Sequence, residues 1–273
     1  MCRGAQPCGL KIIHNRPLLG NFKTNKMRTI KLVSSAAIAS VIFFASCSKS
    51  DPAPASTNPV VIPVQAVNPA LVSMGSSSTI AVLAGSGITN TGATNITGDL
   101  ALSPGTSVGG FPPGILTGTQ HVNDNIATQA KLDLTAAYND AAGRTATDIV
   151  TLSGNIGGLT LTPGLYKSTS TLSISSGDLT FDAKGNADAV FIIQIASSLT
   201  TTSGRKVILT GSAVASHIFW QVGSSATFGT TSVFKGTVLA MQSITFDTGA
   251  SLNGRALART GAVVMAGNTI VKE

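Results

Sequence analysis

Short stretches of this chain alternate apolar or small residues with residues that carry a hydroxyl group. The clearest are 199–202, 226–229 and 244–247, with weaker copies at 88–91 and 172–175 and one without hydroxyls at 263–266. A period of two is typical of a β-strand with one buried and one solvent-facing side. Within each stretch, the hydroxyl groups should therefore lie on the same outer face.

These strands return after 18 to 27 residues, and no helical pattern separates the later ones. The regular return of one short strand predicts stacked coils, as in a β-solenoid. Stacking would align the hydroxyls of successive coils in two parallel rows on one flat sheet, which is the candidate site. The residues in these rows are Thr89, Thr91, Ser173, Ser175, Thr200, Thr202, Thr227 and Thr245. Thr237 should lie on a neighbouring strand outside the rows.

One segment, from about residue 123 to 142, has the pattern of a long helix. Its apolar residues recur at three- and four-residue steps, namely Ile126, Ala130, Leu134, Ala137, Tyr138 and Ala141. Asn123 or Asp124 is placed to cap its start, and Gly143 follows its end. We expect a helix with one apolar stripe.

Two apolar runs, at 190–195 and 217–222, are nearly continuous, as expected of strands buried on both sides. A helix of about twenty residues is roughly 30 Å long, which matches about six stacked strands. The helix should therefore lie along the solenoid and cover these strands. Its charged residues, Lys131, Asp133 and Asp140, should form its solvated side.

The first 46 residues contain the pattern of an export signal. Basic residues at 27–31 precede an apolar run at 32–45, which is too short to span a membrane. The run ends in Phe-Ala-Ser-Cys47, which resembles the lipobox of bacterial lipoproteins, where the cysteine is acylated after cleavage on its amino side. We expect translation to start at Met27 and Cys47 to carry a lipid. The protein would then be an outer-membrane or cell-surface lipoprotein, or alternatively secreted with an ordinary thiol at Cys47.

Charge argues against a nucleic-acid partner. The net charge is +7, but all seven excess cations precede Cys47, and the remainder has eleven basic and eleven acidic residues. Such a neutral domain has no strong attraction to phosphate chains. No cysteine follows Cys47, so neither a disulfide nor a thiolate metal site is expected after it.

Composition divides the chain into three parts. Residues 1–46 hold the signal, 47–77 the anchor and a linker, and 78–273 the folded domain. Five prolines between residues 51 and 69 predict an extended spacer. The first buried strand, at 79–84, places the start of the domain near Ser78.

Several short motifs follow one another from residue 78 to residue 271. They include Gly-Ile-Thr-Asn-Thr-Gly at 87–92, Ser-Pro-Gly-Thr at 103–106, Gly-Phe-Pro-Pro-Gly at 110–114, Leu-Thr-Ala-Ala-Tyr-Asn-Asp-Ala-Ala-Gly-Arg at 134–144, Leu-Thr-Pro-Gly-Leu-Tyr at 161–166 and Asn-Gly-Arg-Ala-Leu-Ala-Arg at 253–259. In this order they resemble the microbial ice-binding protein family. The resemblance implies an all-β-dominated fold, a right-handed β-solenoid of triangular section with one long α-helix alongside, whose N-terminal coil packs next to its C-terminal coil.

The resemblance also implies ice binding through a flat strand face. Relatives often add a Thr-(Ala or Gly)-x-(Thr or Asn) motif at its edge, which 91–94 fits and 248–251 nearly fits. Thr94 and Thr248, together with Asp247 in the row itself, thereby join the candidate site. No cofactor or metal is implied. The expected partner is the ice crystal, the membrane is contacted only through the lipid, and the protein is expected to be a monomer.

The hydroxyl rows favour ice binding on physical grounds as well. Hydroxyls two residues apart on a strand lie about 6.7 Å apart, and adjacent strands about 4.8 Å apart, so the rows form a two-dimensional lattice. Threonine is stiff at χ1, which lowers the entropy lost on binding. Gly229, Asp247, Val264 and Ala266 interrupt the rows, so modest activity is expected. Exposed threonines are also good strand residues in their own right.

Two other functions have to be compared with ice binding. A cell-surface adhesion or polysaccharide-binding module could use the same sheet, and the anchor, the spacer and the neutral surface suit it equally well. An enzyme would need clustered carboxylates, a general base or bound Ca²⁺. The acids are scattered, with only Asp178 and Asp182 close in sequence, and His121 and His217 are isolated. We therefore expect no catalysis.

Overall fold

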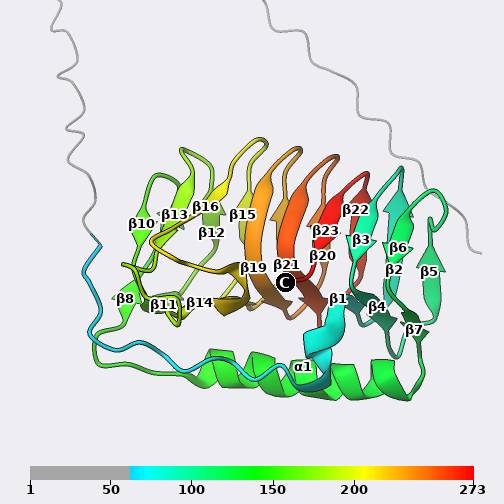
Figure 1. The fold of residues 1–273 in the computed structure, drawn as a ribbon, viewed down its shortest axis with the longest axis horizontal. Helices are drawn as coiled ribbons and strands as arrows, with labels where there is room; N and C mark the ends of the chain where they lie inside the picture. The colour runs from blue at the N-terminus through cyan, green and yellow to red at the C-terminus, as the bar shows by residue number, and fades with distance from the viewer. Residues whose placement is uncertain (1–61) are drawn as a thin grey trace, which may run out of the picture. The chain divides into compact units, whose positions relative to one another are not determined.

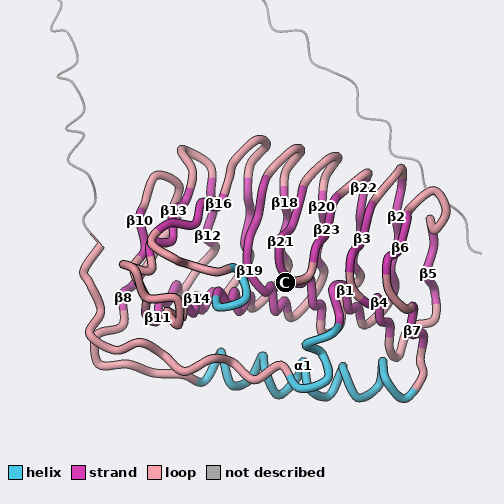
Figure 2. The backbone as a smooth tube through the Cα atoms, in the orientation of Figure 1, coloured by secondary structure: helices cyan, strands magenta, loops and turns pink. Residues whose placement is uncertain are grey.

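Parallel strands wind into a stack of coils, and the long helix α1 (Asn125–Gly143) runs along the stack (Figure 1). This computed structural model describes residues 62–273, which lie within one compact unit, Ser56–Glu273. The coils have three faces, and the turns gather where the faces meet (Figure 2). Two short 3₁₀ turns, η1 (Gly75–Thr79) and η2 (Ala215–His217), precede strands β1 and β17. The predicted β-solenoid with a flanking helix is confirmed.

The first face, called the flat face below, is an eight-stranded parallel sheet. Its strands in spatial order are β5 (Ser107–Gly109), β2 (Gly87–Thr91), β22 (Val263–Ala266), β20 (Ile244–Phe246), β18 (Ala226–Phe228), β15 (Leu199–Thr201), β12 (Leu172–Ile174) and β9 (Gly154–Asn155). In β12, β15, β18 and β20, the first and third residues are buried and the second is partly exposed. The period of two in the sequence thus reflects one side packed inside the coils and one side facing solvent.

The second face lies under α1. Its strands are β8 (Val150–Thr151), β11 (Gly164–Ser168), β14 (Phe191–Ile195), β17 (Ile218–Val222), the second halves of β19 (Val233–Ala240) and β21 (Ser251–Ala258), β1 (Ile80–Ala84), β4 (Asp99–Leu102) and β7 (Gln120–Val122). All residues of β1, β14 and β17 are buried. Because α1 contacts these strands from outside and the core contacts them from inside, both sides are apolar, as the continuous runs predict.

The third face is formed by β10 (Thr160–Leu161), β13 (Leu179–Asp182), β16 (Val207–Thr210), the first halves of β19 and β21, β23 (Thr269–Val271), β3 (Asn95–Thr97) and β6 (Ile115–Thr117). Strands β19 and β21 continue from this face into the second without a break in pairing. They turn the corner at Gly236 and Gly254, which have φ of 110° and 139°. A Cβ atom on Gly254 would lie 2.0 Å from the carbonyl oxygen of Gly236, so only glycine fits there.

The stack is discontinuous in sequence. The N-terminal coil docks on the C-terminal coil because β1 pairs with β21, β2 with β22 and β3 with β23. Arg255 spans this junction, since its guanidinium donates to the carbonyl oxygens of Ser78 (3.1 and 3.0 Å) and Glu273 (3.0 Å). Arg255 is only 8 % exposed, so the bonds form in a desolvated place, and this burial lowers the pKa of Arg255. The expected packing of the two coils is confirmed.

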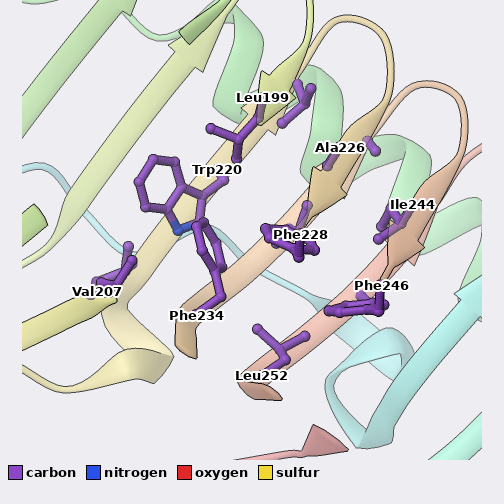
Figure 3. Close-up of a cluster of buried hydrophobic side chains, with 14 of the residues drawn as sticks. Leu199, Val207, Trp220, Ala226, Phe228, Phe234, Ile244, Phe246 and Leu252 are labelled. Carbon is purple, nitrogen blue, oxygen red and sulfur yellow. The ribbon is translucent and has the colours of Figure 1, made fainter. Parts of the chain in front are cut away.

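Inside the coils, aromatic rings stack from one rung to the next beneath the flat face (Figure 3). The rings of Phe228 and Phe246 lie 4.8 Å apart and nearly parallel, and Phe234 lies 4.4 Å from Phe228. Trp220 extends the stack and donates its indole N–H to the carbonyl oxygen of Lys235. A close-packed ladder of this kind holds the strands above it at a fixed spacing.

Helix α1 begins as predicted, because Asp124 accepts a hydrogen bond from the amide of Ala127 (2.7 Å). The predicted stripe is right except at its first member. Ile126 is 48 % exposed, and Ala127 is buried in its place. At about 100° per residue, the later buried residues define a stripe whose centre lies closer to position 127 than to position 126. Gly143 is the last helical residue rather than the one that follows the end.

Two of the three charges predicted to form the solvated side of α1 are engaged instead. The carboxylate of Asp133 accepts bonds from the amide and hydroxyl of Ser76 (2.7 and 2.6 Å), which lowers the pKa of Asp133. Lys131 is partly buried and donates to the carbonyl oxygens of Ala258 (3.0 Å) and Arg259. Asp140 is exposed, as predicted, and pairs with Arg144.

Residues 62–77, called the strap below, pack along α1 and β11 and are part of the fold. Gln65 is 8 % exposed and accepts a bond from the amide of Leu165 (2.8 Å), while Asn68 accepts one from the amide of Val190 (2.8 Å). Arg144 donates to the carbonyl oxygens of Ala70 and Leu71. The predicted boundary at Ser78 is therefore too late, because these side-chain contacts hold an otherwise linker-like segment.

Candidate functional site: the outer surface of the flat face

Backbone pairing aligns one outward residue from each strand of the flat face in a first row. In spatial order the row is Asn155, Ser173, Thr200, Thr227, Thr245, Val264, Thr89 and Gly109. Five of these residues carry hydroxyl groups that the sequence predicts to lie in the rows. Four of the five, from Ser173 to Thr245, are consecutive. Val264 separates this run from Thr89. Asn155 belongs to the row but was missed, since its strand has only two residues and no visible alternation.

A second row follows two residues further along each strand. It consists of Ser175, Thr202, Gly229, Asp247, Ala266 and Thr91. The amides of Thr202, Gly229 and Asp247 donate to residues of the preceding coil, which carries the register of the sheet beyond the strand ends. Asp247 is exposed, and its neighbours in the row are Gly229, which has no side chain, and Ala266, which has only a methyl group.

A third row of small residues lies before the first and was not predicted. The row consists of Ser198, Ser225, Ser243 and Ala262. It is aligned by backbone hydrogen bonds, which the amides of Leu199, Ala226 and Ile244 donate to the carbonyl oxygens of Ser225, Ser243 and Ala262. Each of these row residues is partly exposed. The sequence signal was a serine before Leu199, Ala226 and Ile244, but these serines fall in the turns, where the alternation is not evident.

Thr94 does not belong to the candidate surface. It is completely buried, its hydroxyl donates to the side-chain oxygen of Asn90 (2.5 Å), and it accepts a bond from the amide of Asn268 (2.9 Å). Gly92, with φ of 79°, turns the chain inward before it. The edge motif at 91–94 therefore supplies Thr91 to the surface, while Thr94 ties the N-terminal coil to the C-terminal one.

Thr248 lies exposed on the turn between the flat face and the third face. Its carbonyl oxygen accepts a bond from the amide of Thr231 (3.0 Å), which aligns the two turns. Thr230, beside Thr231, is exposed as well and was missed by the sequence. Hydroxyls thus continue from the second row onto this corner.

The hydroxyls of the first row are available to an external partner. Among the described residues, none accepts or donates a hydrogen bond with the side chain of Thr200, Thr227 or Thr245. The Ser173 hydroxyl, in contrast, lies 3.4 Å from that of Ser175, which donates to Asn155 Oδ1 (3.0 Å). The central threonines therefore present unpaired donors and acceptors next to methyl groups, at the spacing of the strands.

Three of the four residues considered for catalysis are engaged in other contacts, and Nδ1 of the fourth, His217, is buried without a hydrogen-bond partner among the described residues. Asp182 pairs with Lys184 (2.8 Å), whose hydrogen bonds lower the pKa of Asp182, and Asp178 lies 3.8 Å from Arg205. His121 bonds to Asp124, the cap of α1 (2.8 Å). Residues 62–273 contain no group of three or more His, Cys, Asp or Glu side chains that could hold a metal ion. In the same part of the chain, no helix has the length and apolar character needed to cross a membrane.

Comparison with known proteins gives consistent matches. A family described as "Ice-binding-like" matches residues 82–271. An ice-binding protein of Nostoc sp. (strain HG1) is 44 % identical over 199 residues, which cover 72 % of each chain. The crystal structure of an ice binding protein from an Antarctic biological consortium has 71 % identity and a TM-score of 0.77, and the match covers 77 % of this chain and 95 % of that one. The ice-binding protein of the ascomycete Antarctomyces psychrotrophicus has 40 % identity and a TM-score of 0.70, over 74 % of this chain and 98 % of that one.

Proposed function

This chain belongs to the ice-binding-like family, and from that premise we propose that it adsorbs to ice crystals through the outer surface of its flat face. The observation that carries the proposal is the run Ser173, Thr200, Thr227 and Thr245, aligned by the pairing of four adjacent strands. Adsorption through this run would inhibit the growth and recrystallisation of ice.

The geometry suits an ordered water layer. Outward groups repeat about every 4.8 Å across the strands and about every 6.7 Å along them, so hydroxyls and methyls alternate on a fixed lattice. The rings of Phe228 and Phe246 stack in the core (Figure 3), on the inner side of the strands that carry Thr227 and Thr245, and limit the movement of the row. Because the surface is already ordered, little conformational entropy is lost when it binds a crystal.

Interruptions in the rows set an expectation of modest activity. Val264 divides the first row, and Gly229, Asp247 and Ala266 occupy the middle of the second. A carboxylate holds its own hydration shell, which does not match the water positions of a crystal. The strongest contact should therefore be made by the first row from Ser173 to Thr245.

The experiment that tests this function is an assay of ice recrystallisation inhibition with purified residues 56–273, run beside a glycan-binding screen. The proposal expects inhibition at micromolar protein and no saturable glycan binding. The opposite result, glycan binding without an effect on ice, would favour an adhesion or polysaccharide-binding module.

Export and anchoring form a second part of the proposal, which concerns residues outside the described range. We propose that the signal starts at Met27, that Cys47 is acylated, and that a monomeric domain is displayed at the outer membrane or cell surface. The lipobox-like residues before Cys47 and the proline-rich segment after it support this. In a Gram-negative host, the parent should fractionate with membranes and carry the mass of a lipid at Cys47. Release of Cys47→Ser from the membrane would agree, whereas identical fractionation of both forms would exclude the anchor.

A further inference from the structure

The flat face crosses one junction at which neighbouring coils do not follow one another in the chain. Strands β2 and β3 of the N-terminal coil lie beside β22 and β23 of the C-terminal coil (Figure 1). Thr94 and Asn268, which meet at this junction, are 174 residues apart. No short connection therefore sets the register of β2 on β22, and a slip of one residue would turn the outward residues of β2 inward.

A column of residues runs along the corner between the flat face and the third face. Strand pairing aligns Ser232, Ala250, Asn268, Thr94 and Gly114, one from each of five successive coils. The first four are at most 1 % exposed. Between Ser232 and Ala250 no side chains are hydrogen-bonded, because alanine has no polar group and the Ser232 hydroxyl has no partner among the described residues. Side chains that form hydrogen bonds appear in the column only next to the junction.

At the junction, the buried side chains of Asn268, Thr94 and Asn90 take part in one chain of hydrogen bonds. Nδ2 of Asn268 donates to the carbonyl oxygen of Asp247 on the preceding coil (2.8 Å). The backbone amide of Asn268 donates across the junction to the Thr94 hydroxyl (2.9 Å), which donates to Oδ1 of Asn90 (2.5 Å). Nδ2 of Asn90 donates to the carbonyl oxygen of Gly110 on the coil beyond (2.8 Å). Four successive coils are linked in this way.

This hydrogen-bond chain also holds three consecutive members of the second row, Asp247, Ala266 and Thr91. The carbonyl oxygen of Asp247 and the amide of Ala266 both bond to the side chain of Asn268. The carbonyl oxygen of Thr91 accepts a bond from the amide of Gly267, the residue before Asn268 (2.8 Å). The chain therefore fixes the height of Thr91, and of Thr89 two residues before it, relative to the hydroxyls of the C-terminal coils.

A slip at the junction would leave several buried polar groups without partners. The Thr94 hydroxyl, Oδ1 of Asn90 and the amide of Asn268 satisfy one another and are shielded from water. A buried polar group that loses its partner is not compensated by solvent, so the observed register is strongly favoured over its alternatives.

We propose that the ice-contacting surface continues across the junction onto Thr89 and Thr91, and that Thr94 is the residue that positions them. This inference rests on the proposed function and extends it beyond the run from Ser173 to Thr245. Val264 separates that run from Thr89, but valine has the shape of threonine and carries no charge. It interrupts the hydroxyls without interrupting the flat surface.

The test measures ice-affinity partitioning of single variants of residues 56–273, which form one compact unit, with circular dichroism to show that each is folded at the assay temperature. Thr94→Val keeps the shape of the side chain and removes the hydroxyl, and should lower ice affinity about threefold to tenfold. Thr94→Ser keeps the hydroxyl and should restore most of this loss. A merely structural role of Thr94 would lower the melting temperature of Thr94→Val and leave the ice affinity of the folded protein unchanged.

A matched control is Thr201→Val in strand β15 of the flat face. Thr201 is 1 % exposed, and its hydroxyl has no hydrogen-bond partner among the described residues. The same substitution there removes a buried hydroxyl that fixes no register. Its ice affinity should equal that of the parent.

A double-mutant cycle with Thr89→Tyr shows whether the loss arises in the N-terminal coil. Thr89 is exposed, so tyrosine does not disturb the core. In the parent background, Thr89→Tyr should lower ice affinity at least about threefold, whereas in Thr94→Val it should lower it less than about twofold, because the coil is already displaced. The single variant Thr89→Tyr also decides the question if Thr94→Val does not fold.

The outcomes separate this inference from the proposed function. If the parent binds ice and the folded Thr94→Val variant binds equally well, or Thr89→Tyr binds like the parent, the inference is wrong and the proposed function stands. An equal loss in Thr94→Val and Thr201→Val would also overturn the positioning role. A parent that does not bind ice would overturn the proposed function and this inference with it.

Discussion

Replacing Thr227 with tyrosine should remove most of the ice binding and leave the domain folded. Thr227 lies near the middle of the first row, and its partners on the two adjacent strands are Thr200 and Thr245. The ring would stand above the row and hold these neighbours away from a planar crystal. If each of the three hydroxyls contributes about 0.5–1.5 kcal/mol, the loss is roughly 1.5–4.5 kcal/mol, which is at least about tenfold in affinity.

The stability of the Thr227→Tyr variant should change little. The side chain is partly exposed and points away from Phe228, which fills the core beneath it. Tyrosine is a good strand residue, so the free energy of unfolding should change by no more than about 0.5 kcal/mol. Ice-affinity partitioning and thermal hysteresis measure binding, and circular dichroism during heating measures stability.

A matched control is Thr180→Tyr on the third face. Thr180 is also partly exposed and central in a parallel sheet, between Thr160 and Ile208. Thr237, which the sequence places outside the rows, cannot serve, because it is completely buried and accepts a bond from Arg255 (3.4 Å). If Thr227→Tyr and Thr180→Tyr are both folded and both bind ice like the parent, the flat face is not the binding surface.

Three further changes test other parts of the account. Asp247→Thr should raise thermal hysteresis about twofold, because threonine fits the row and replaces a hydrated carboxylate. Lower thermal hysteresis would contradict the idea that Asp247 weakens ice binding by the second row. A chain that begins at Ser78 lacks the strap, and it should melt at least about 5 °C below a chain that begins at Ser56. Equal melting temperatures would show that the strap does not stabilise the domain. Arg255→Met should lower the free energy of unfolding, measured by urea denaturation, by about 2–4 kcal/mol, because two carbonyl groups at the coil junction lose a charged donor. A change below about 0.5 kcal/mol would contradict this role of Arg255.

The sequence predicts the first row well because the signal is local. A period of two fixes which residues point outward, and the coil repeat fixes which strands are neighbours, so Thr200, Thr227 and Thr245 align as expected. The helix stripe is predicted for the same reason. Its one error, Ile126 for Ala127, arises because the stripe formed by the later buried residues has its centre closer to position 127 than to position 126.

Features that depend on contacts between distant residues could not be predicted in this way. The burial of Thr94 depends on Asn268, 174 residues away. The strap has the composition of a linker, and its order comes from acceptors such as Gln65 and Asn68. These side chains reach the amides of Leu165 in β11 and of Val190, just before β14, which are 100 and 122 residues away.

The central claim is tested most directly by growing a single ice crystal in a dilute solution of fluorescently labelled residues 56–273. A protein that adsorbs through the flat face should concentrate on defined crystal planes and enter the ice, and labelled Thr227→Tyr should be pushed ahead of the growing front. If the labelled parent is itself excluded from the ice at every plane, the domain does not bind ice, and the hydroxyl rows serve another partner.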